Sequence, residues 1–283
     1  MPVQASWDLE TSGRRPACIG WASALLVAVA ATRYFTAAAQ LAGASPTELL
    51  AAILAAFPAR SSGPVGPDRG RAPNRAVADH IERRRAIIAS AEDAADMRRR
   101  MGAAALEMDA ASDGSWQMQW RDTVAARLPS QNWPERTMFI TAVDAQTGEP
   151  VVFHGQSGVD LVDAVAASCS SGRPYRIGDG LYIDGGYRSN AENADLAAGY
   201  ARVLVLSPFG GRTLTPFSWG MHLATQVDDL RAAGSIVETI FPDSDSEHMF
   251  GADAMDPSLR PLAARAGYDL GSALARQLTG FWR

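Results

Sequence analysis

One acidic residue is set in a pattern that could do chemistry. Asp184 ends the short apolar run 181–184 and is followed directly by Gly185 and Gly186. A carboxylate at the end of a buried strand can approach another loop closely when two glycines follow it, because glycine has no Cβ to hold two backbones apart. An aspartate within hydrogen-bond reach of a serine hydroxyl can take its proton as the hydroxyl attacks an ester carbonyl. The same tripeptide also forms ordinary turns, so both interpretations stay open.

Composition argues against metal and nucleic-acid chemistry. The chain has 283 residues, four histidines and a formal net charge of -5. No histidine has another histidine four residues away, or a cysteine or carboxylate at ligand spacing, so we expect no metal and no other cofactor. An acidic chain without a basic face is not expected to bind nucleic acid. The two cysteines, Cys18 and Cys169, are predicted to be buried thiols.

Continuous apolar runs predict the strands that would carry Asp184. They lie at residues 137–143, 149–153, 202–206 and 236–241, and the shorter run 182–184 leads into the Gly-Gly turn. Strands of this buried type that alternate with helices indicate an α/β fold with a mainly parallel central sheet. We therefore predict that residues 137–143, 202–206 and 235–241 are neighbours in one such sheet.

Helical segments surround these strands. A capping box that begins at Ser45 divides the Ala- and Leu-rich stretch 34–57 into two helices, with Ser45 as an N-cap. Residues 58–74 are rich in Pro, Gly, Ser and Arg and have no apolar period, which predicts an exposed loop or linker. Further helices are predicted at 76–108, as one long helix or two abutting ones, and at 120–128, 161–167, 219–233 and 257–278.

Two motifs together resemble a known family. The first is Ala164-Val165-Ala166-Ala167-Ser168-Cys169, and the second is Leu181-Tyr182-Ile183-Asp184-Gly185-Gly186, followed by Asn193-Ala194-Asp195-Leu196 and the strand 203–206. In this order they resemble the patatin-like phospholipases, and the likeness extends from Met138 to the C-terminus and more loosely back to Tyr34. The resemblance implies a three-layer α/β/α sandwich and a single patatin-like domain over residues 1–283, of which 1–33 are atypical or incomplete.

The resemblance also implies an activity. Members of this family hydrolyse acyl esters of lipids through a Ser-Asp dyad that requires no histidine, metal or cofactor. Asp184 takes the place of the catalytic aspartate, with Gly185 and Gly186 as the motif glycines. The implied partner is a phospholipid or another acyl ester, reached by transient contact with a membrane surface, and the implied location is the cytoplasm.

The nucleophile motif is the part of the resemblance that is not intact. A patatin-like hydrolase should carry Gly-x-Ser-x-Gly on a strand-to-helix turn, behind a glycine-rich loop that supplies oxyanion donors. The nearest stretch begins at Gly20, and in it the nucleophile position falls on Ala22, so that Ser23 comes one residue late. Nineteen residues precede Gly20, too few for the usual first strand and glycine loop. Ser23 is the candidate nucleophile, and its alternative interpretation is a small residue on a buried helix.

Three tryptophans and one loop bear on an acyl-binding site. Trp116, Trp120 and Trp133 could cover an apolar acyl channel, although aromatic residues at such spacing also occur in plain cores. Between Cys169 and Asp184 the family has a proline-rich stretch, whereas this chain is shorter there and has one proline. We expect this wall of the site to differ from that of the family.

Two other functions stay open. An N-terminally incomplete relative could keep the scaffold and a lipid-binding groove without turnover, which the missing Gly-x-Ser-x-Gly favours. A chain tethered to a membrane by the apolar run 17–31 is the third hypothesis, although the run is short for a bilayer span. The run follows Arg14 and Arg15 as in a signal peptide, but Asp8 and Glu10 before it argue against export.

The slipped position of Ser23 leads to a prediction about activity. On a helix, one residue of slip rotates a side chain by about 100 degrees, so Ser23 should point away from Asp184 unless the turn before Ser23 is remodelled. We expect the purified chain to hydrolyse short-chain nitrophenyl esters weakly or not at all, and a variant with a restored Gly-x-Ser-x-Gly elbow and glycine loop to be active. Robust turnover by the unaltered chain that Ser23→Ala and Asp184→Asn both abolish would contradict this prediction.

Overall fold

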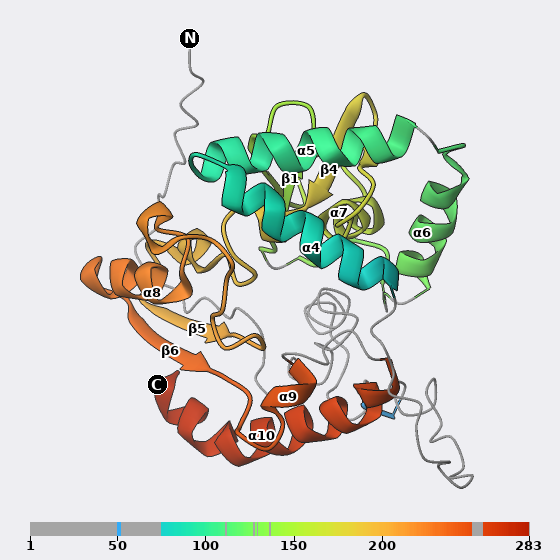
Figure 1. The fold of residues 1–283 in the computed structure, drawn as a ribbon. Coiled ribbons are helices and arrows are strands. Elements are labelled where there is room, and N and C mark those ends of the chain that lie inside the picture. The colour runs from blue at the N-terminus through green and yellow to red at the C-terminus, as the bar shows by residue number, and fades with distance from the viewer. Residues whose placement is uncertain are drawn as a thin grey trace, which may run out of the picture.

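The computed structural model describes residues 50–51, residues 75–250 apart from 111, 127, 129 and 136, and residues 257–282. These residues form a mixed α/β protein, which confirms the predicted fold class at this level. The larger sheet and its helices make up one half of the molecule, and a smaller sheet with its own helices makes up the other (Figure 1).

The larger sheet is antiparallel throughout. Its strands are β1 (Ile140–Asp144), β2 (Pro150–Phe153), β3 (Tyr175–Ile177) and β4 (Gly180–Asp184), in the order β2-β1-β4-β3. A tight turn joins β1 to β2, in which the Asp144 carboxylate accepts the backbone N–H groups of Gln146 and Thr147 at 2.8 and 2.9 Å. Gly148 completes the turn at φ 77°, a left-handed conformation that favours glycine. A connection this short can only join antiparallel strands.

Helices cover both faces of this sheet. On one face, α6 (Ser115–Ala125) and α7 (Leu161–Ser168) pack on a cluster that contains Ala142 of β1. On the other face, α4 (Arg75–Ser90) and α5 (Ala94–Ala110) pack on a cluster that contains the next residue of β1, Val143. Because successive side chains of a strand point to opposite faces, β1 contributes to both cores and is buried over most of its length.

The smaller sheet is parallel and has the same layered arrangement. Its two strands are β5 (Arg202–Leu206) and β6 (Ile236–Ile240). Val203 and Val205 face the 3-10 turn η3 (Ala194–Ala197) and α8 (Leu223–Ala232), whereas Leu204 and Leu206 face α10 (Arg260–Phe281). The remaining short elements are η2 (Gly185–Tyr187), η4 (Phe217–Trp219), α9 (Glu247–Phe250) and η5 (Pro257–Leu259).

The prediction of one mainly parallel sheet is wrong for the residues that the structure describes. The run 137–143 supplies β1 of the antiparallel sheet, whereas 202–206 and 235–241 supply the two strands of the separate parallel sheet. Continuous apolar character reports burial on both faces of a strand, and helices cover both faces of each sheet here. Burial of this kind does not fix which strands pair or in which direction.

A local signal sets the start of α5. The predicted helix at 76–108 is two helices that part at residues 91–93, and the second begins where the Asp93 carboxylate accepts the backbone N–H of Asp96 at 2.7 Å. Gly102 does not break α5. Instead, a Cβ at this position would overlap the carbonyl oxygen of Ala145, so glycine lets the helix approach the end of β1 closely.

Several predicted segments lie outside the described residues. They are the atypical N-terminus 1–33, the apolar run 17–31, the loop 58–74, and the stretch 34–57 apart from 50–51. Among the described helices, none is both long and apolar enough to cross a lipid bilayer.

The approach of α5 to β1 can be tested with a pair of glycine variants. Gly102→Ala should destabilise the fold by about 1–2 kcal/mol, because the added methyl group must push α5 away from Ala145. Gly280→Ala, in an open position of α10, should instead stabilise it by up to about 1 kcal/mol through helix propensity. Urea unfolding monitored by circular dichroism measures both, and equal effects of the two substitutions would contradict the packing described here.

Candidate functional site

Asp184 lies at the C-terminal end of β4, inside the four-stranded sheet, and pairs with Ala142 of β1. The sequence predicts that Asp184 ends a strand and lines a concave site. The strand end is confirmed, but Asp184 is not in the wall of the pocket described below. The half-buried carboxylate accepts the backbone N–H of Gly186 at 2.8 Å. The backbone N–H of Asp184 donates to the carbonyl of Ser170 at 2.9 Å, which ties the strand end to the loop that follows α7.

The two glycines after Asp184 form the 3-10 turn η2, and Gly185 is required by packing. A Cβ on Gly185 would overlap both the carbonyl oxygen and the Oγ1 of Thr141 in β1. Neither Gly185 nor Gly186 has a positive φ, so backbone conformation does not explain them. The predicted close approach is confirmed, and the partner that Gly185 approaches is the strand paired with β4.

Helix α4 brings a histidine and an arginine to this turn. The guanidinium carbon of Arg84 lies 5.4 Å from the centroid of the Tyr187 ring, and His80 precedes Arg84 by one helical turn. Burial, followed by the charges of Arg84 and Arg83, lowers the pKa of His80 below 6.5, while the Asp184 charge partly offsets these effects. Burial and then the Asp184 charge raise the pKa of Tyr187. The Asp184 carboxylate therefore acts electrostatically on both residues.

The sequence offers Arg188 and Arg173 as salt-bridge partners for Asp184, and in the structure Arg188 pairs with a different carboxylate. Its guanidinium donates two hydrogen bonds to Asp195, of 2.7 and 3.0 Å, and a third to Asn193 Oδ1 at 2.9 Å. Only 14% of the Arg188 side chain is exposed. The other candidate, Arg173, lies in the loop after α7 and lines the pocket described below.

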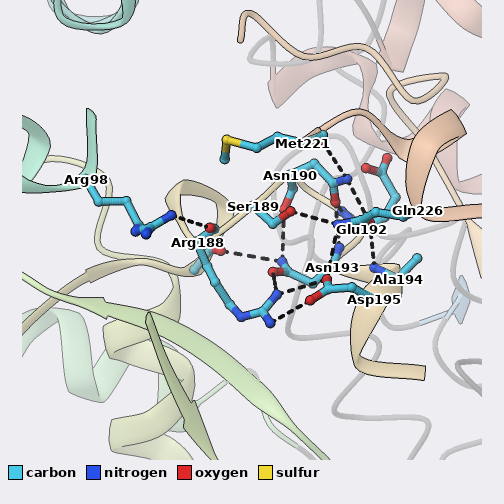
Figure 2. Close-up of polar contacts among 11 residues, drawn as sticks. Arg98, Arg188, Ser189, Asn190, Glu192, Asn193, Ala194, Asp195, Met221 and Gln226 are labelled. Atoms are coloured by element: carbon cyan, nitrogen blue, oxygen red, sulfur yellow. Dashed lines mark hydrogen bonds and ion pairs between the residues drawn. The ribbon is translucent and has the colours of Figure 1, made fainter. Parts of the chain in front are cut away.

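A buried polar network holds the turn after Asp184 in place (Figure 2). Asn193, in a left-handed conformation at φ 49°, donates from its side chain to the carbonyl of Gly185 at 3.4 Å. Arg98 of α5 donates to the carbonyl of Arg188 at 3.2 Å. Gln226 of α8 donates to Asp195 at 3.1 Å and accepts the backbone N–H of Ala194 at 3.0 Å. The network thus connects η2 with helices from both halves of the molecule.

A pocket of about 470 Å³ lies between α6 and the loop 169–173. We call it the α6 pocket; α6 contributes Trp116, Gln119, Trp120 and Thr123, and the loop contributes residues 169–173. Asp184 is not among the residues that line this pocket. The loop 169–173 is nevertheless hydrogen-bonded to the Asp184 turn, because the Ser170 carbonyl accepts the Asp184 N–H and the Ser171 carbonyl accepts the Tyr187 hydroxyl at 3.0 Å. All three predicted tryptophans pack against the core, and two of them, Trp116 and Trp120, also line the pocket.

The predicted nucleophile lies outside the described residues, together with Gly20 and Ala22. Ser168 lies at the end of α7, and Ser170 lies in the loop that is hydrogen-bonded to Asp184. No described hydrogen bond joins either hydroxyl group to the Asp184 carboxylate. Ser170 donates its hydroxyl to the carbonyl of Ala166 at 2.7 Å, and the buried hydroxyl of Ser168 has no hydrogen-bond partner among the described residues. Cys169 is half-buried and lines the α6 pocket, so it is not the fully buried thiol predicted from the sequence.

Sequence reasoning missed two α4 residues near the turn after β4: Arg84, which lies over the Tyr187 ring, and His80, whose pKa the Asp184 charge affects. His80 and Arg84 are four residues apart, a spacing that places them on one face of a helix, but nothing in the sequence says which face meets β4. In the described part of the chain, no group of three or more His, Cys, Asp or Glu side chains could hold a metal ion.

The chain matches no protein-family model, and a search of curated proteins finds no relative.

The buried ion pair of the network should contribute measurably to stability. Arg188→Met leaves the Asp195 carboxylate without its bidentate partner in a half-buried place, and we expect a loss of about 2–3 kcal/mol in the free energy of unfolding. The matched control is Arg212→Met, whose salt bridge with Glu247 is more than half exposed on both sides, and it should cost less than about 1 kcal/mol. Urea unfolding of both variants decides, and a loss at Arg188 no larger than that at Arg212 would contradict a structural role for the network.

Proposed function

We propose that this chain is a serine acyl hydrolase of the patatin-like type that cleaves carboxylic esters of phospholipids or other lipids. Asp184 is the general base and Ser23 is the candidate nucleophile. The observation that carries the proposal is the placement of Asp184, whose carboxylate is fixed at a strand end by the Gly186 N–H on a turn packed tightly against β1. A base held in one place is what proton transfer to and from a hydroxyl requires.

The proposed reaction has two steps. The Ser23 hydroxyl attacks the ester carbonyl carbon while its proton passes to Asp184, and the protonated Asp184 then returns this proton to the departing alcohol. Water next attacks the acyl-serine, gives its proton to Asp184, and releases the fatty acid as the serine is protonated again. No metal or cofactor takes part in this scheme.

The family assignment within this proposal rests on sequence motifs. The helix-end run 164–169 and the Asp184 turn carry it, and in the structure Ser170, the residue directly after the run, accepts the backbone N–H of Asp184. A mainly parallel central sheet is not part of the proposal, because the described sheet that holds Asp184 is antiparallel. We propose that the chain acts in the cytoplasm, in transient contact with membrane surfaces.

A second candidate function is lipid binding without turnover. The α6 pocket favours it, because the pocket has two indole rings in its wall and Asp184 is not among its lining residues. Apolar pockets with a few polar groups are the usual form of small-molecule sites. In this alternative the chain is a catalytically impaired relative that keeps the scaffold.

Covalent labelling by a fluorophosphonate tests the hydrolase proposal, because the reagent reacts with an activated serine even when ester turnover is slow. We expect Ser23→Ala to abolish labelling and Asp184→Asn to slow it by about a hundredfold, the usual contribution of a general base. The Asn side chain can still accept the Gly186 N–H, so the turn should survive. Asp179→Asn, on the exposed turn between β3 and β4, is the matched control and should label at the unaltered rate.

Three results would count against the hydrolase. Labelling of Asp184→Asn at the full rate would remove Asp184 as the base, and labelling of Ser23→Ala would remove Ser23 as the nucleophile. Absence of labelling in the unaltered chain would favour the lipid-binding alternative.

A further inference from the structure

The α6 pocket is built from rigid parts. Trp120 donates its indole N–H to the carbonyl of Ala166 at 3.0 Å, which joins α6 to α7. Trp116 donates its own indole N–H toward Asp109 at 3.4 Å and packs edge-on against the buried ring of Tyr175, with 6.4 Å between ring centroids. Both indole N–H groups therefore have partners within the protein. The rings are left to offer carbon surface to the pocket, which suits an apolar ligand.

The opposite wall carries positive charge and hydrogen-bond donors. Arg173 is exposed, and among the described residues it forms no salt bridge within 4 Å, although the Asp113 carboxylate senses its charge. The backbone N–H groups of Ser171, Gly172 and Arg173 donate to no other described residue. Of the residues that line the pocket, none is acidic. A guanidinium and peptide N–H groups together are the usual partners of a carboxylate or phosphate.

We propose that the α6 pocket binds a small anionic amphiphile, with its apolar body on the indoles of Trp116 and Trp120 and its carboxylate or phosphate at Arg173. A volume of about 470 Å³ is in the range of sites that hold one small-molecule ligand. Binding in this pocket requires neither Ser23 nor ester hydrolysis, so a failure of the hydrolase proposal would not affect it.

Isothermal titration of the purified chain with sodium dodecanoate tests the pocket, at concentrations below those at which the ligand forms micelles. We expect one saturable site per chain, and a similar site for dodecyl phosphate, because both ligands present an anionic head on the same chain. Dodecyltrimethylammonium has the same apolar chain and the opposite charge, and it should bind at least about tenfold more weakly.

Paired variants locate the site. Trp116→Ala should weaken dodecanoate binding about tenfold, while Trp133→Ala should leave it unchanged. Trp133 is the matched control because it is half-buried and donates its indole N–H within the protein, as Trp116 does, but does not line the pocket. Arg173→Gln should weaken binding about three- to tenfold, and Arg176→Gln, an exposed arginine of β3 that does not line the pocket, should not.

A variant that blocks the pocket tests the proposal without altering a residue that packs against the core, as Trp116 does. An added Cβ at Gly172 meets no atom within 4 Å, and the residue has no positive φ, so Gly172→Phe should fold normally and fill the pocket. Loss of dodecanoate binding in this variant, with the unaltered chain's urea midpoint retained, supports the proposal. Absence of saturable binding to the unaltered chain, equal binding of the cationic ligand, or equal effects of the members of either variant pair would overturn it.

Discussion

The contact between Gly185 and Thr141 fixes where the Asp184 carboxylate can lie. Because no side chain separates them, the turn after β4 packs directly on the backbone of β1. This packing sets the position of the Gly186 N–H, which in turn holds the Asp184 carboxylate. A larger residue at position 185 would move both groups together. The Arg188 network and the loop after α7 both make hydrogen bonds to this turn or to Asp184.

The loop after α7 has two faces with different properties. One face accepts hydrogen bonds from the Asp184 N–H and the Tyr187 hydroxyl, and the other lines the α6 pocket with Arg173. A proline-rich stretch would offer fewer N–H donors here, because proline has none. The loop without those prolines can therefore present peptide N–H groups to a ligand on the pocket side while its carbonyls hold the Asp184 turn.

The polar network joins the two halves of the molecule at a real energetic cost, since Arg188 is taken largely out of water. Its two bonds to Asp195 and one to Asn193 offset this cost, although the buried Arg188 Nε has no partner among the described residues. Gln226 of α8 bonds to the same Asp195, so the helix that covers β5 and the turn that follows β4 share one carboxylate. Movement of one half relative to the other would break several of these bonds at once.

The sequence alone determined the local features of this protein: the mixed α/β class, the apolar runs that became strands, and a carboxylate at a strand end before two glycines, the first of them closely packed. These features depend on propensity, periodicity and backbone sterics, which act over a few residues. Tertiary structure decided the rest. It paired 137–143 with β2 and β4 instead of β5. It placed Arg84 of α4 over the Tyr187 ring and brought Arg188 into a salt bridge with Asp195. Periodicity reports that a face is buried, but the partner that buries it is chosen by long-range packing, which no local pattern records.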